Sequence, residues 1–200
     1  MPAEVARQGF APGARERLPM PDAASMNDAQ RAAAQGLIDG PRKGVFGPFL
    51  PLLRSPQLLE RVAKMGEYLR FESVLDARVR ELVTCAVARH TGNQFEWVMH
   101  APLAVKAGIS QDTIDALHAG ARPKQLHRGE EIALDFTREL LTTHGACDAT
   151  FAEALAAFGE QGVVELSSLV GYFVMVCWVM NIARTPAQPA SATGLGGFPQ

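Results

Sequence analysis

The chain has 200 residues, of which 48% are hydrophobic and 20% are charged, and its formal net charge is −2. This length suggests one domain, and the apolar content excludes an intrinsically disordered chain. Nineteen basic residues against 21 acidic ones provide no cationic surface of the kind that binds nucleic acid or a membrane. We therefore expect neither of these partners.

The 13 prolines are unevenly distributed, and only Pro102 and Pro123 lie between residues 57 and 185. Because proline breaks helix interiors, that long middle stretch is compatible with helices, whereas the two ends are not. We expect a flexible N-terminal arm over residues 1–25, a helical domain over residues 26–185 and a Pro/Gly-rich tail over residues 186–200.

The three cysteines, Cys85, Cys147 and Cys177, are far apart and form no CxxC motif, which argues against a disulfide framework and a structural zinc site. The N-terminus lacks the apolar stretch of a signal peptide. The longest apolar run, residues 169–180, is shorter than the roughly 20 residues that span a bilayer. We interpret the protein as soluble and cytoplasmic.

Capping residues and helix breakers divide the chain into helices, with Asn27, Asp76, Asn93 and Ser110 as N-caps. The expected helices cover residues 28–38, 55–70, 76–92, 93–108, 110–120, 130–143, 148–159 and 163–184. The segment GVFGPFLPLLRSP is apolar but full of breakers, so we expect it to cover an apolar surface without forming a long helix. No segment alternates like a strand, and the fold class is therefore all-α with seven or eight helices.

The last predicted helix, VVELSSLVGYFVMVCWVMNIAR, is apolar on nearly all sides. Such a helix is either central in a bundle or buried by a partner chain. A monomer of this size has little material to cover it, so we expect an obligate homo-oligomer.

Glu96 and His100 are i, i+4 neighbours on one predicted helix and fall inside the apolar stripe that contains Trp97. A carboxylate and an imidazole in such a stripe are costly to bury unless they pair or face a cavity. The alternative is an ordinary pair on the helix surface.

Glu81 on the preceding helix is a second candidate, because its neighbours on that face, Cys85 and Ala88, are small and weakly polar. The alternative is an exposed carboxylate that pairs with Arg78 or Arg80. Pro102 follows His100 by two residues, and we expect it to kink the helix and help shape a pocket; a bend around neighbouring helices is the other explanation.

No metal-binding spacing, phosphate loop or GxSxG motif occurs. Glu81, Glu96 and His100 could in principle bind a metal, but nothing in the sequence specifies one. We therefore expect no metal and no cofactor.

The stretch LDARVRELVTCAVARHTGNQFEWVMHAPLAVKAGISQDTIDAL resembles the carboxymuconolactone decarboxylase family, part of the all-α superfamily that includes alkylhydroperoxidase D. The EWxxH element and the AGIS turn carry the resemblance, which extends over about residues 40–186. It implies an oligomeric multi-helix bundle of the alkylhydroperoxidase D-like type, and a trimer or hexamer.

Thiol peroxidases of this superfamily carry a glutamate followed by a CxxCxxxH motif. Their spacing matches the glutamate to Glu81 and the histidine to His100, whereas Asn93 and Glu96 stand at the two cysteine positions. Since a thiolate is the nucleophile in peroxide chemistry, the resemblance favours decarboxylase-type chemistry and disfavours peroxidase activity.

The resemblance implies a cofactor-independent acid–base lyase, of decarboxylase or isomerase type, that acts on a small carboxylated lactone or a related intermediate of aromatic-compound degradation. His100 would be the general acid–base, with Glu81 orienting it and Glu96 as a second proton carrier. Trp97, Cys85 and Asn93 are candidate substrate contacts. One further residue would hold a substrate carboxylate, and the candidates are Arg78, Arg89 and Arg184.

Two alternatives remain open at this point. The same pocket could belong to a non-catalytic oligomer that binds a small aromatic or lactone ligand. A residual redox role through Cys85 would instead need a second thiol close to it in space.

Overall fold

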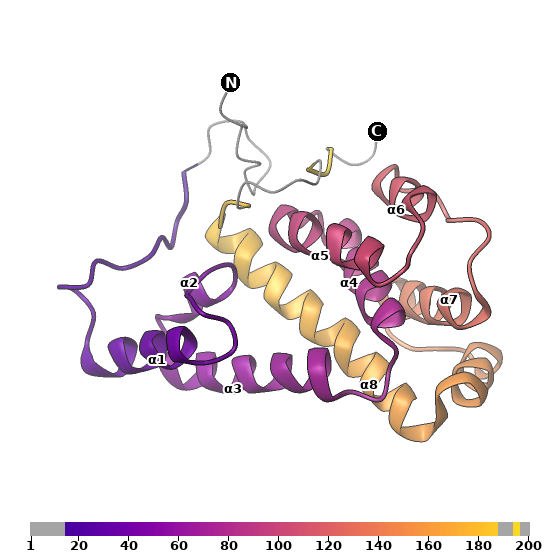
Figure 1. The fold of residues 1–200 in the computed structure, drawn as a ribbon, viewed down its shortest axis with the longest axis horizontal. Coiled ribbons are helices and arrows are strands. Elements are labelled where there is room, and N and C mark those ends of the chain that lie inside the picture. The colour runs from indigo at the N-terminus through magenta and orange to yellow at the C-terminus, as the bar shows by residue number, and fades with distance from the viewer. Residues whose placement is uncertain (1–14, 188–193, 197–200) are drawn as a thin grey trace.

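The computed structural model describes residues 15–187 and 194–196, and within them the chain forms eight α-helices, one π-helical turn and no strand (Figure 1). The predicted all-α fold class is confirmed. The elements are α1 (Asp28–Asp39), α2 (Phe49–Leu52), α3 (Pro56–Glu67), η1 (Tyr68–Glu72), α4 (Ala77–Thr91), α5 (Gln94–Lys106), α6 (Gln111–His118), α7 (Arg128–Thr143) and α8 (Asp148–Ala183).

Side-chain caps begin four of these helices as predicted, because the side chains of Asn27, Asp76, Asn93 and Ser110 each accept a hydrogen bond from a backbone N–H in the first turn. Two boundaries differ. The helix from Pro56 widens into the π-helical turn η1 after Glu67. Helix α7 begins two residues early, since the Glu130 carboxylate accepts a hydrogen bond from the His127 N–H and satisfies that free donor.

Helix α8 contains both of the helices that the sequence predicted after residue 148, separated by a non-helical residue at Gly159 (φ 69°, ψ 176°). It passes between α1–α3 on one side and α4–α7 on the other (Figure 1), and it contacts α2, η1, α4 and α7. By length and composition alone α8 could cross a membrane, with a mean hydropathy of 1.9 in its most apolar window, but 56% of that window is buried in the fold. The buried part of α8 forms the centre of the hydrophobic core.

The apolar segment after α1 folds over the middle of the molecule, as predicted. It forms only the short helix α2, and Phe49, Leu52 and Leu53 are buried in the main core. Gly47 has φ +59°, and a Cβ there would lie 2.4 Å from the Phe95 ring. The segment can therefore approach α5 closely only because residue 47 has no side chain.

Glu165 of α8 fixes the π-helical turn. Its carboxylate accepts hydrogen bonds from the hydroxyls of Tyr68 and Ser73, both at 2.6 Å, and from the Val74 N–H at 2.8 Å. Burial alone raises the pKa of Glu165, but these hydrogen bonds outweigh it and lower that pKa to about 2. The charged carboxylate thus ties both ends of η1 to the central helix, and η1 carries Arg70.

Parts of the predicted arm and tail are described, and both lie against the helical domain. The Arg17 N–H donates to the Ala183 carbonyl at 2.7 Å. In the tail, Leu195 is buried and exchanges two hydrogen bonds with the Gln94 side chain. Residues 1–14, 188–193 and 197–200 lie outside the described residues, and so do the predictions made for them.

Helix α5 is a single helix that contains Pro102. Met99, His100 and Leu103 line the cavity described below. Pro102 itself does not line the cavity, and the expected kink of α5 at this residue stays a prediction.

Candidate active site

The three charged residues that the sequence singled out meet at one point. His100 Nδ1 lies 2.6 Å from Glu81 Oε2 of α4, and His100 Nε2 lies 3.2 Å from Glu96 Oε2, one turn earlier on α5. Asn93 holds the start of this helix, because its side-chain oxygen accepts the Glu96 N–H at 2.9 Å. Both nitrogens of one imidazole are therefore bound by carboxylates from two packed helices.

The cluster is almost closed to solvent, with 6%, 5% and 17% of the side chains of His100, Glu96 and Glu81 exposed. Burial lowers the pKa of His100, but the hydrogen bonds and negative charges of Glu81 and Glu96 outweigh it and raise that pKa to about 9. The imidazole is thus held as a cation at neutral pH, where both ring nitrogens donate.

This arrangement can store and move a proton. The short contact to Glu81 fixes the ring, since a carboxylate on Nδ1 orients a histidine and stabilises its charged form. The contact between Nε2 and Glu96 is longer, so the proton on Nε2 is exchanged more easily than the proton on Nδ1. Because Glu96 and His100 both line a cavity, the proton can reach a molecule bound there.

The cavity has a volume of about 50 Å³ and lies between α5, α8 and the segment before α2. Four phenylalanines and one tyrosine are among its lining residues, and Phe173 meets the His100 ring edge-on at 5.2 Å between centroids. Its lining residues are Arg42, Phe46, Pro48, Phe49, Arg70, Phe95, Glu96, Met99, His100, Leu103, Tyr172 and Phe173.

Two arginines converge on this cavity from elements outside α4 and α5. Arg42 follows α1 and stacks on the Phe49 ring with its guanidinium carbon 4.4 Å from the centroid, and Arg70 lies on η1. In the described residues, the Nε atoms of both are buried without a hydrogen-bond partner. Their mutual repulsion contributes to a lowered pKa of Arg42, of which burial is the main cause. The cavity lining thus includes two guanidinium groups, and the Nε of Arg42 also lies 3.7 Å from Glu67 Oε1 in an ion pair.

Tyr172 of α8 lies beside Arg42 and lines the same cavity. Burial raises the pKa of its hydroxyl to about 12, so the hydroxyl remains protonated and can donate. A Cβ on Gly66 of α3 would lie 2.1 Å from this hydroxyl oxygen. The absence of a side chain at residue 66 therefore makes room for Tyr172.

The structure places the other predicted contacts behind the cavity wall. Trp97 is buried in the second hydrophobic cluster, and Asn93 donates to Asn181 Oδ1 at 2.9 Å. Cys85 is fully buried, and burial together with the charges of Glu81 and Glu96 raises the pKa of its thiol well above the usual value. None of these three lines the cavity.

The predicted carboxylate-binding arginines also lie elsewhere. Arg78 forms an ion pair with Glu130 at 2.5 Å. Arg89 lines a different cavity, and Arg184 is the C-cap of α8, with left-handed backbone dihedral angles. The structure brings Arg42 and Arg70 to the site in their place. Periodicity around the EWxxH element gives no signal for them, because both belong to segments that reach the site only through folding.

In the part of the chain that the structure describes, the candidate active site contains no cluster of thiols or of metal ligands. Cys177 is buried and the pKa of its thiol is raised well above its usual value, mainly by burial, while Cys147 is exposed at the start of α8. Within residues 15–187 and 194–196, no group of three His, Cys, Asp or Glu residues is arranged to hold a metal ion.

Solved structures share this fold at low sequence identity. An uncharacterized peroxidase-related protein from Silicibacter sp. TM1040 matches with a TM-score of 0.68 and 17% identity, over 89% of this chain and 95% of that one. An uncharacterized peroxidase-related protein from Ralstonia eutropha JMP134, with an alkylhydroperoxidase AhpD core, matches with a TM-score of 0.65 and 17% identity, over 83% and 88% of the two chains.

A protein of unknown function from Agrobacterium tumefaciens, named as a candidate antioxidant defence protein AhpD, has a TM-score of 0.62 and 18% identity, over 69% of this chain and 95% of that one. The fold is therefore that of the all-α, AhpD-like proteins. Residues 56–127 match the model of the carboxymuconolactone decarboxylase family. No curated protein matches the sequence.

Proposed function

We propose that the protein is a cofactor-independent acid–base lyase, of decarboxylase or isomerase type, that acts on a small carboxylated lactone or a related intermediate of aromatic-compound degradation. One observation carries this proposal: a buried imidazole, held by carboxylates at both nitrogens, faces a cavity that two arginines also line. His100 and Glu96 are the proton carriers, and Glu81 is the positioning residue.

In this mechanism Arg42 and Arg70 bind the carboxylates of the substrate, because guanidinium groups pair with carboxylates through charge-assisted hydrogen bonds. Loss of carbon dioxide breaks a C–C bond, and the electron pair moves into the conjugated lactone carbonyl. His100 then delivers a proton to carbon, and the neutral imidazole regains a proton from solvent by way of the Glu96 carboxylate. The substrate itself accepts the electron pair, so no organic cofactor is required.

The volume of the cavity sets a requirement for substrate binding. About 50 Å³ holds only one or two water molecules, whereas ligand pockets usually enclose several hundred Å³. Phe46 and Pro48 of the segment before α2 line the cavity together with Phe49, the first residue of α2. We infer that this segment moves outward when a lactone acid enters.

The test is a screen of lactone acids and dicarboxylic acids with purified protein, read as release of carbon dioxide or as isomerisation. For a compound that turns over, we expect Arg70→Met to raise KM about tenfold or more, because one charge-assisted contact is lost. Arg61→Met is the matched control, since Arg61 is exposed on α3 and far from the cavity lining. Equal KM values for the two variants would remove Arg70 from the site.

The alternative functions give different results in this screen. A non-catalytic binding protein would bind a lactone acid but leave it unchanged over long incubation. A thiol-based redox role has less support, because the buried thiols of Cys85 and Cys177 have raised pKa values, which disfavours the reactive thiolate.

We also propose a homo-oligomer, a trimer or hexamer, that uses the uncovered side of α8. Val164, Trp178 and Ile182 are each more than 60% exposed on that helix, and such apolar surface normally marks an interface. We expect light scattering after size exclusion to give a multiple of the 21.5 kDa chain mass, and Trp178→Lys to shift the protein to smaller species. A monodisperse wild-type monomer would contradict this proposal.

The proposed compartment is the cytoplasm. The three cysteines are free, which fits a reducing environment.

A further inference from the structure

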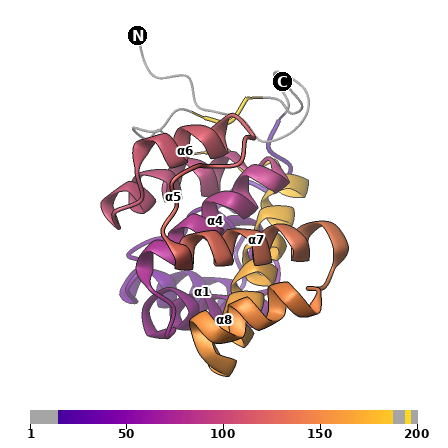
Figure 2. The same ribbon diagram turned by 90° about the vertical axis from the view of Figure 1, so that its right-hand side faces the viewer.

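A second, larger cavity lies on the other side of α4 from the active site. It has a volume of about 550 Å³, within the range of small-molecule sites. Its floor is formed by Ala86 and Arg89 of α4, and its walls by α6, the loop after α6 and α7. Figure 2 shows α4, α6 and α7 on the face where this cavity lies.

Both apolar and basic side chains line this cavity. Leu117, Leu134 and Leu141 give it an apolar surface, while Arg89, Arg122 and Arg138 bring three guanidinium groups against a single carboxylate, that of Asp135. The excess of positive charge and the apolar lining together match a molecule with an apolar body and a negatively charged group.

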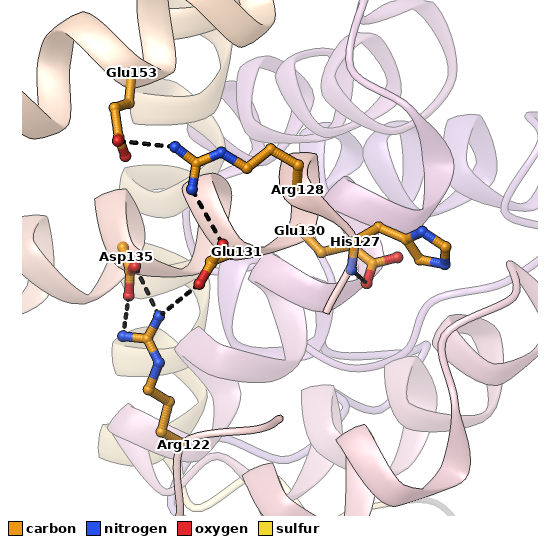
Figure 3. A network of polar contacts seen from close by, with 7 residues as sticks. All are labelled: Arg122, His127, Arg128, Glu130, Glu131, Asp135 and Glu153. Carbon is orange, nitrogen blue, oxygen red and sulfur yellow. Dashed lines mark hydrogen bonds and ion pairs between the residues drawn. The ribbon is translucent and has the colours of Figure 1, made fainter. Parts of the chain in front are cut away.

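A network of ion pairs fixes the loop that forms one wall (Figure 3). Arg122 binds both carboxylate oxygens of Asp135, at 2.6 and 2.8 Å, and lies 3.6 Å from Glu131. Arg128 in turn joins Glu131 to Glu153 of α8. The wall is therefore preorganised, and the charge of Arg122 is already matched by Asp135.

Two groups in the cavity lack such partners. Arg138 is exposed on α7, and among the described residues its guanidinium has neither an ion pair nor a hydrogen bond. Thr137, the preceding residue, is fully buried, and its hydroxyl finds no hydrogen-bond partner in the described part of the chain. The Thr137 hydroxyl is closed to solvent, so the exposed guanidinium of Arg138 is the group of these two that a bound molecule can reach.

We propose that this cavity is a binding site for a small organic anion with an apolar body, such as an aromatic or medium-chain carboxylate. Arg138 pairs with the negative group, Arg89 adds positive potential from the floor, and the leucines hold the apolar part. The site uses none of Glu81, Glu96 and His100, so it exists whether or not the lyase proposal holds.

The test uses naphthalene-2-carboxylate as the probe and titration calorimetry as the readout. We expect one saturable site per chain and at least tenfold weaker binding of the neutral analogue naphthalene-2-carboxamide. Arg138→Met should weaken binding of the carboxylate about tenfold, since a charge-assisted hydrogen bond is lost. Arg61→Met removes the same charge from the exposed face of α3 and should leave binding unchanged.

Three further variants make the result decisive. Thr137→Val preserves the shape of the side chain, and we expect unchanged binding because the hydroxyl is closed to solvent. Leu141→Trp should block binding by filling the cavity, and His100→Asn should leave it intact. The proposal is overturned if the probe does not bind, if the amide binds as tightly as the carboxylate, if Arg138→Met behaves like Arg61→Met, or if His100→Asn abolishes binding.

Discussion

Replacing His100 by asparagine is expected to reduce turnover of the substrate found in the screen by about 10²–10⁴-fold, the usual contribution of a positioned general acid–base. Asparagine is uncharged and can still donate a hydrogen bond, but it cannot carry a proton to substrate carbon. Since Arg42 and Arg70, which also line the cavity, are untouched, KM should change much less than kcat. Steady-state kinetics on the two proteins measure both quantities.

His144→Asn is the matched control. His144 is exposed at the C-cap of α7 with φ +66°, a conformation that asparagine also adopts readily. This variant should keep wild-type turnover. Undiminished turnover in His100→Asn would eliminate His100 as the proton carrier, and equal losses in both variants would point to a general defect in folding.

The second large effect is on stability as a function of pH. His100 has a pKa of about 9 in the folded protein against about 6.5 for an unperturbed histidine. A raised folded-state pKa means that protonated His100 stabilises the fold fully below about pH 6.5. This contribution declines above that pH and is lost as the pH rises through about 9. The shift corresponds to about 3 kcal/mol of unfolding free energy.

Urea unfolding at pH 6.5, 8 and 10 measures this dependence. We expect the wild type to lose about 3 kcal/mol more than His100→Asn across this range, because only the wild type releases the buried proton. Glu81→Gln should move the loss to lower pH, since one of the two carboxylates that raise the pKa of His100 is removed. Parallel stability curves for the wild type and His100→Asn would contradict a raised pKa at this site.

Local chemistry determined most of the secondary structure, and the sequence was sufficient to predict it. Caps such as Asp76 and Asn93 act on backbone groups within one helical turn, so their effect can be read without knowledge of the fold. The prediction erred where a longer-range contact intervened. Glu165 holds both ends of η1 from more than 90 residues away, and no local pattern signals that bond.

The pairing of Glu96 with His100 follows from helical spacing alone, and their place in an apolar stripe indicated that both are buried. The small, weakly polar neighbours of Glu81 on its own helix made it a further candidate, and the structure brings it to Nδ1 of the ring. These three residues lie on two consecutive helices joined by a tight turn. Nearness in the chain therefore made the core of the candidate site predictable.

Only the tertiary structure revealed what surrounds that core. Arg42 and Arg70 lie on segments with no periodic link to α5, and they reach the cavity because α2 and η1 pack against α8. The family resemblance left Arg78, Arg89 and Arg184 as open candidates, and the fold directs Arg78 to Glu130 and Arg89 to a second cavity. The proline-poor middle of the chain thus determined the helices by itself, through local hydrogen bonds and periodic burial. The shape and charge of both cavities depend on side chains that only long-range packing brings together.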